Sequence, residues 1–169
     1  LILLPYKHPD YLMVAILPKQ GISIDSWLGG KKQSSLSRFI MQSIDKAQYE
    51  YISLALPTFE SSYKDSLVDN LQRLGMTLCF DASRSDFSNM LRSAGKAVVI
   101  DDVLHKTYIR LDEQGTEAAA VTAVVMKLTS MAPRPARSLI FDRPFFYAII
   151  DTARQIPLFM GVLDHPQEI

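Results

Sequence analysis

The side chains that most often carry chemistry are few in this chain of 169 residues, and they lie far apart in the sequence. The three histidines, His8, His105 and His165, lack the spacing of metal ligands, so we expect no metal site. Cys79 is the single cysteine and lies beside Phe80, a context typical of a small buried hydrophobic residue. The sequence therefore predicts neither a metal centre nor a catalytic thiol.

Two adjacent carboxylate pairs are the other candidates for acid and base chemistry. They are Asp101 with Asp102, and Asp112 with Glu113. Neighbouring side chains of a strand point to opposite faces, so neither pair can act together on one substrate atom. We predict no catalytic residue, no cofactor and no enzymatic activity.

The composition is that of a globular chain, with 48% hydrophobic and 21% charged residues. Eighteen basic and eighteen acidic residues cancel, which argues against nucleic acid and against anionic membranes as partners. No apolar run approaches the length of a membrane span. Residues 1–18 lack the order of segments found in a signal peptide.

Apolar periodicity predicts an α+β fold with many strands. The residues at 34–47 have helical spacing, and a short helix is expected at 66–74, with Ser66 and Asp69 as a capping pair and Gly75 just past its end. Residues 79–90 are polar and typical of a surface loop. Strands are predicted at 1–6, 11–17, 51–59, 97–112, 139–141, 145–150 and 157–163.

The predicted strand at 97–112 carries His105 in the same phase as Ile109 and Leu111. Because alternate residues of a strand share a face, the pattern predicts that His105 is a hydrogen-bonded histidine of the core.

Residues 113–128, which follow this strand, carry two conflicting local preferences. Thr116 could cap a helix, and the three alanines that follow Glu117 favour one. Val121, Thr122 and the two later valines are stiff at χ1 and favour an extended backbone. Such a conflict is expected in a segment that changes conformation.

As a strand, this segment would have one uncharged face. The phase that runs from Thr116 to Leu128 in steps of two contains no charge, whereas Glu117 and Lys127 fall in the other phase. The uncharged phase is also small in its first half. A strand of this kind is suited to insertion between two others.

These residues carry a family resemblance. The run Glu113-x-Gly115-Thr116-Glu117-Ala118-Ala119-Ala120-x-Thr122 resembles the hinge of the reactive-centre loop of inhibitory serpins. Other segments resemble serpins in the same order: Leu56-Pro57-x-Phe59, Leu74-Gly75, Ser85-Asp86-Phe87-Ser88, His105-Lys106, Arg143-Pro144-Phe145 and Leu158-Phe159-Met160-Gly161. The resemblance implies that residues 1–169 are the C-terminal part of a single serpin domain, with mostly antiparallel sheets, a few helices and a reactive-centre loop at about 113–138.

The resemblance also implies the function, which is inhibition of a serine protease by a suicide-substrate mechanism. The protease would attack the loop, and the cleaved loop would then insert into the main sheet in a conformational change. His105 resembles a serpin histidine that helps to hold this sheet closed. The N-terminal remainder of a serpin is expected as a partner. A secreted, extracellular location is implied, and an intracellular one stays open.

The spacing from the serpin hinge places the reactive bond at Thr129–Ser130, with Leu128–Thr129 and Ser130–Met131 as alternatives. Threonine or leucine before the bond favours an elastase-like or chymotrypsin-like target. Residues 113–129, when extended, span about 55 Å, which exceeds a domain diameter.

Three alternatives remain. The chain could be a non-inhibitory serpin-like binding protein or protease substrate, a fragment that is unable to trap a protease, or a plain α+β domain in which residues 113–128 form a stable helix. The basic residues Arg134, Arg137 and Arg143 lie among prolines, and we interpret them as a solvated connector.

Overall fold

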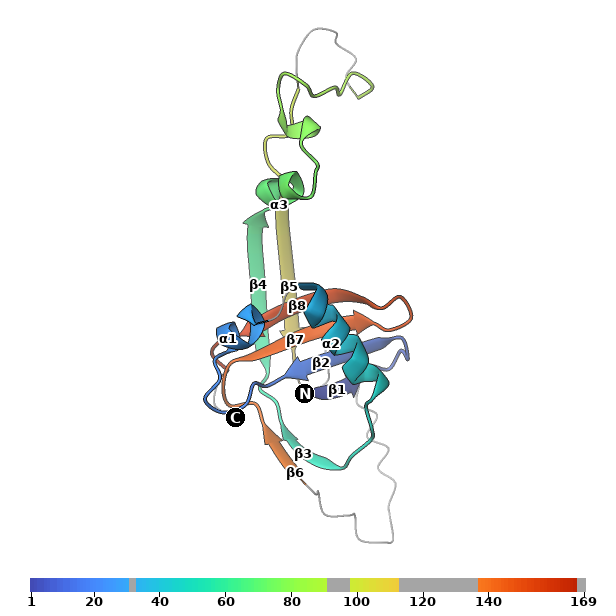
Figure 1. Cartoon of the computed structure of the whole chain (residues 1–169), viewed down its shortest axis with the longest axis vertical. Coiled ribbons are helices and arrows are strands. Elements are labelled where there is room, and N and C mark those ends of the chain that lie inside the picture. The colour runs from blue at the N-terminus through green and yellow to red at the C-terminus, as the bar shows by residue number, and fades with distance from the viewer. Residues whose placement is uncertain (31–32, 91–97, 113–136, 167–169) are drawn as a thin grey trace. The chain divides into compact units, whose positions relative to one another are not determined.

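The computed structural model describes residues 1–30, 33–90, 98–112 and 137–166. The chain forms two compact units. The first contains Leu1–Glu60 together with Arg110–Ile169, and the second contains Ser61–Ile109 (Figure 1).

The first unit is built on a four-stranded antiparallel sheet in the order β1-β2-β7-β8. The strands are β1 (Ile2–Pro5), β2 (Tyr11–Ile16), β7 (Phe145–Asp151) and β8 (Ile156–Leu163). Every residue of β7 is buried, and β2 is buried after its first residue. A strand that is buried on both faces needs a continuous apolar run, which is what these two segments have.

One face of this sheet is covered by two helices, α1 (Ile24–Gly29) and α2 (Gln33–Asp45) (Figure 1). Ser23 begins α1, because its side-chain oxygen accepts a hydrogen bond from the backbone of Ser26 at 3.2 Å. Trp27 of α1 contacts Phe39 of α2 edge-on. The core on this face consists of alternate sheet residues and one residue from each helix: Leu12, Val14, Ile16, Phe146, Ala148, Ile150, Ile24 and Ile40.

The opposite face of the sheet carries an aromatic cluster. Phe145 packs edge-on against Phe59 and Phe141, with ring centroids 6.1 and 4.9 Å apart. The ring of Tyr147 lies 5.0 Å from that of Phe59. Phe141 and Phe145 are fully buried. This cluster packs Phe59 and Phe141, which both lie between β2 and β7 in the chain, against the central strand β7.

Two smaller sheets complete the described strands. β3 (Ile52–Ala55) pairs in parallel with β6 (Arg137–Ile140), and β4 (Phe59–Ser66) pairs with β5 (Leu104–Leu111) (Figure 1). The second unit also contains α3 (Val68–Arg73) and a 3₁₀ turn at Leu78–Phe80.

The fold confirms the predicted α+β class, and several elements have different bounds. The helix α1 and the strand β4 were not expected. The strand predicted at 97–112 begins only at Leu104, because Ile100 donates its N–H to the Cys79 carbonyl at 2.9 Å and lies outside the ladder. Cys79, expected to be buried, is only partly buried.

The end of α3 is as predicted, and its start is not. Gly75 has φ of 97°, and its N–H donates to the carbonyl of Gln72, so it provides the left-handed residue after the helix. At the start, the Ser66 hydroxyl hydrogen-bonds Asp102 at 2.5 Å and not Asp69. Leu67 occupies the cap position and makes no side-chain capping bond.

Candidate reactive-loop scaffold

The predicted hinge and reactive bond lie between β5 and β6. All of their residues are outside the described part of the chain: Glu113, Gly115, Thr116, Glu117, Ala118, Ala119, Ala120, Thr122, Thr129 and Ser130. The structure therefore describes the scaffold from which residues 113–136 depart and to which they return. β6 begins at Arg137, within the last two residues of the predicted loop.

The departure point is the end of β5. Leu111 is buried, and Arg110 beside it is exposed, as the alternation of a strand requires. The Nε of Arg110 lies 3.6 Å from carboxylate oxygens of Glu60 and of Asp112. These ion pairs are exposed, so each contributes at most about 1 kcal/mol. They link the last described residue before the loop to the start of β4.

The return point is the pairing of β6 with β3. Arg137 lies in register with Ile52, and its guanidinium is 3.1 Å from the carboxylate of Glu50. Just past the end of β6, the Phe141 N–H donates to the Ala55 carbonyl at 2.9 Å. Since Phe141 is fully buried, the chain is anchored in the core within five residues of its return.

Arg143 is a second anchor on the return side. Its Nη2 donates to the Pro18 carbonyl at 2.9 Å, and its Nη1 lies 2.9 Å from Asp142. Its Nε is buried and has no hydrogen-bond partner among the described atoms. Arg143 and Arg137 therefore bind different acceptors, and Arg134 lies outside the described residues. The interpretation of Arg143 as part of a solvated connector is wrong, because its side chain is hydrogen-bonded to the carbonyl of Pro18, which follows β2.

His105 is exposed, so the prediction of a core histidine is wrong. The phase that it shares with Ile109 and Leu111 becomes buried only at these two later residues. Among the described strands, β5 pairs only with β4. The side of β5 that carries His105 is exposed at that residue. Its role in holding a main sheet closed remains a prediction.

In the first unit, the carboxylate of Asp151 has a pKa that its hydrogen bonds shift from the usual value. Asp151, at the end of β7, accepts hydrogen bonds from the backbone N–H of Arg154 at 2.9 Å and from its guanidinium at 2.8 Å. The backbone bond and the guanidinium both lower the pKa of Asp151 below its usual value. They fix the turn between β7 and β8.

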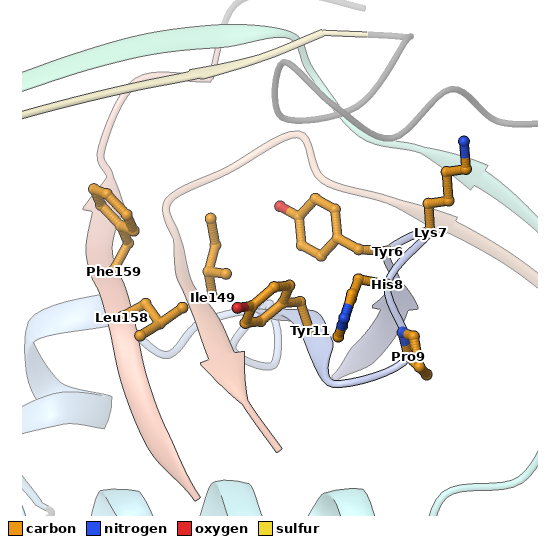
Figure 2. Close-up of a pocket in the computed structure, with 8 residues that line it drawn as sticks. All are labelled: Tyr6, Lys7, His8, Pro9, Tyr11, Ile149, Leu158 and Phe159. Carbon is orange, nitrogen blue, oxygen red and sulfur yellow. The ribbon is translucent and has the colours of Figure 1, made fainter. Parts of the chain in front are cut away.

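No group of three or more histidine, cysteine or carboxylate side chains within the described ranges is placed to hold a metal ion. Among the helices of the described residues, none has the length and apolar character needed to cross a membrane. The described structure does contain an apolar pocket of about 590 Å³ between the β1–β2 turn and β8 (Figure 2). Of its lining residues, only Leu158 and Phe159 belong to a motif noted in the sequence.

Comparison with known proteins identifies the family. The model of the Serpin family, described as serine protease inhibitor, matches residues 1–166. Iripin-5 of Ixodes ricinus is 32% identical over 96% of this chain, and an uncharacterized serpin-like protein of Thermococcus kodakarensis is 36% identical over 98% of it. The native structure of tengpin, a thermophilic serpin, matches 95% of this chain with a TM-score of 0.73 and 33% identity. The chain belongs to the serpin family.

The matches also show that this chain corresponds to part of a serpin. It covers 39% of Iripin-5, 37% of the Thermococcus protein and 40% of the tengpin chain. The predicted family and the predicted partial serpin fold are confirmed. Serpins are generally serine protease inhibitors.

Proposed function

We propose that this chain is the C-terminal, loop-bearing part of a single serpin domain that inhibits a serine protease as a suicide substrate. The observation that carries the proposal is the sequence of residues 113–128, whose even-numbered phase holds no charge from Thr116 to Leu128. Strands anchored to the core flank this segment on both sides.

The chemistry belongs to the protease. Its serine Oγ attacks the carbonyl carbon of Thr129, the bond to the nitrogen of Ser130 breaks, and the leaving amine takes the proton from the protease histidine. The product is an ester between the protease and Thr129. Residues 113–129 remain covalently joined to β5, so the bound protease stays tethered to the inhibitor.

The alternation of side chains along the two segments supports insertion of residues 116–128 beside β5. The buried residues Ile109 and Leu111 are odd-numbered, whereas the uncharged phase that starts at Thr116 is even-numbered. In an antiparallel hairpin with an even number of turn residues, odd residues of one strand lie opposite even residues of the other. A turn around residues 112–115 of this kind would place both apolar phases on one face, and Gly115 gives it conformational freedom.

Insertion also needs reach and a driving force. Residues 113–129 extended span about 55 Å, enough to carry a protease across a domain. Backbone groups that are solvated in the loop would pair with neighbouring strands, and apolar side chains would leave water.

The residues beside the reactive bond favour an elastase-like or chymotrypsin-like protease. Secretion is the location that we propose, with an intracellular location as the alternative. The main alternative function is that of a non-inhibitory serpin, or of a protease substrate, which would use the same exposed loop without trapping.

The test is incubation of the protein with elastase-like, chymotrypsin-like and trypsin-like proteases, followed by a denaturing gel. A covalent adduct that survives denaturation with one of the first two proteases is expected. A catalytically inactive protease with its serine replaced by alanine is the control and should give no adduct. Complete cleavage with no adduct from any active protease would contradict inhibition and favour the substrate alternative.

A further inference from the structure

Two exposed tyrosines lie directly before β3. Of the seven tyrosines in the chain, Tyr49 and Tyr51 are the two most exposed, the first fully and the second at 74%. A tyrosine ring offers a large apolar contact area with a polar hydroxyl at its tip, and tyrosines are enriched among the residues that dominate protein interfaces. We call these two residues the tyrosine patch.

Tyr51 continues the exposed face of the β3–β6 sheet. Ser53 and Ser138 are partners in the β3–β6 register, and both are exposed (Figure 1). Ile140 lies two residues after Ser138 and is 49% exposed, as a residue of the same face. Tyr51 lies two residues before Ser53 and is in the same phase. Over its described residues, this face therefore carries an aromatic and an aliphatic side chain and no charge.

The tyrosine patch lies at the point where the chain returns from residues 113–136. β6 begins at Arg137, which is in register with Ile52, the residue after Tyr51. Glu50 lies between the two tyrosines, and its carboxylate is 3.1 Å from the guanidinium of Arg137. The backbone register and the ion pair therefore both place the tyrosine patch beside the first described residue after the predicted reactive bond.

A protease bound at this reactive bond cannot be far from the tyrosine patch. Arg137 lies seven residues after Ser130, and an extended chain of this length spans at most about 25 Å. A domain of about 200 residues has a radius of gyration of about 16 Å and therefore a diameter of about 40 Å. The connection is thus shorter than the protease is wide, so the body of the protease can contact the tyrosine patch while its active site holds the loop.

We propose that the tyrosine patch is a second contact for the protease that attacks residues 113–136. The two rings pack against an apolar protease surface outside the active site, and their hydroxyl groups hydrogen-bond at its rim. This contact adds affinity that the loop alone does not supply, and it selects among proteases that accept the same residue before the bond. The inference rests on the proposed attack on the loop and does not depend on trapping after cleavage.

Binding of inactive proteases measures this contact without any cleavage. The probes are an elastase-like and a chymotrypsin-like protease, each with its catalytic serine replaced by alanine. The test variant combines Tyr49→Ala with Tyr51→Ala. Tyr63→Ala is the matched control, because Tyr63 is 53% exposed and belongs to the second unit. Urea unfolding of the variants checks that the exposed substitutions leave the fold intact.

The double alanine variant is expected to bind the inactive protease about ten-fold more weakly than the wild type, with no change for Tyr63→Ala. Tyr49→Phe combined with Tyr51→Phe should keep most of the affinity, because both rings remain. Equal dissociation constants for the wild type and the double alanine variant would overturn the proposal, as would the absence of binding by either probe. A wild-type dimer that the double alanine variant cannot form would identify a second copy as the occupant and would also overturn it.

The active proteases separate this proposal from the proposed function. Weaker binding of the double alanine variant, together with cleavage of the wild type and no adduct, would contradict suicide inhibition and support the second contact. A covalent adduct with the wild type, together with equal binding by the wild type and the double alanine variant, would support inhibition and overturn the second contact.

Discussion

The ring of Tyr147 on β7 lies directly over the backbone of Gly161 on β8, its partner in the strand register. A Cβ atom at Gly161 would lie 2.5 Å from the Tyr147 hydroxyl oxygen and 2.6 Å from Cζ. Tyr147 is buried and packs against Phe59, so its ring has little room to move. This contact explains why a glycine follows Leu158-Phe159-Met160.

Gly161→Ala is therefore expected to destabilise the protein by about 1–3 kcal/mol, the usual cost of overpacking. Urea unfolding followed by tyrosine and tryptophan fluorescence measures the change. The control is Gly29→Ala, because the added methyl group there meets no heavy atom within 4 Å beyond its chain neighbours and the backbone of its own helix. That variant should be neutral or stabilising by up to about 1 kcal/mol. Equal stabilities of the two variants would contradict the contact with Tyr147.

The stability of the fold should depend on pH through Asp151, at the turn after β7. Its pKa is lowered in the folded state by the Arg154 backbone and guanidinium, so its ionised form stabilises the fold. That stability is fully present above the unfolded pKa of about 4 and is lost as pH falls through the lower folded pKa.

Asp151→Asn should lower the melting temperature at pH 7 and have a smaller effect at pH values below the folded pKa. Thermal unfolding monitored by circular dichroism from pH 7 down to pH 2 measures this dependence. Asp164→Asn is the control, because this residue is exposed. A difference between wild type and Asp151→Asn that stays constant across this range would mean that the carboxylate charge does not stabilise the turn.

The two arginines on the return side of the loop should differ in their effect on stability. Arg143→Met removes a charged hydrogen bond to the buried Pro18 and is expected to cost about 1.5–3 kcal/mol. Arg137→Met removes an exposed ion pair with Glu50 and should cost less than about 1 kcal/mol. Chemical denaturation of both variants gives the comparison. A larger loss of unfolding free energy from Arg137→Met than from Arg143→Met would show that the exposed ion pair with Glu50 stabilises the return side more.

The insertion model makes a prediction about the two phases of the hinge. Thr116→Arg places a charge on the phase that would become buried, where an unpaired charge is costly, so the protease should cleave the loop and escape. Glu117→Arg places the same charge on the solvated phase and should leave trapping intact. The number of inhibitor molecules consumed for each protease molecule inhibited distinguishes the two. Equal values for both variants would contradict insertion of this segment.

The central sheet could be predicted from the sequence because β2 and β7 are apolar on both faces and read as buried runs. β4 could not, because Phe59–Ser66 is mostly polar and exposed, and its strand conformation depends on pairing with the distant β5. The helix α1 spans only six residues, too few to show a period. Its detectable signal was Ser23 at the cap position, followed by Asp25 in the first turn.

A local motif made the Phe159-Met160-Gly161 segment recognisable in the sequence. The hinge also has a local motif, and its assignment stays a prediction because residues 113–122 lie outside the described part of the chain. The face of His105 followed from alternation, but alternation does not say whether anything covers that face. The pocket brings Tyr6 and Tyr11 beside Phe159, which is distant in sequence, so it depends on the strand order and register and has no sequence signal.

The proposal that residues 113–136 form a reactive-centre loop is tested most directly by mass spectrometry after incubation with an elastase-like protease. The expected result is a released peptide that begins at Ser130, together with a covalent adduct in which the protease is joined to Thr129. A peptide that begins at residue 129 or 131 would move the reactive bond by one position and leave the loop assignment unchanged. The absence of any cleavage between residues 113 and 136, under conditions in which other sites are cut, would contradict it.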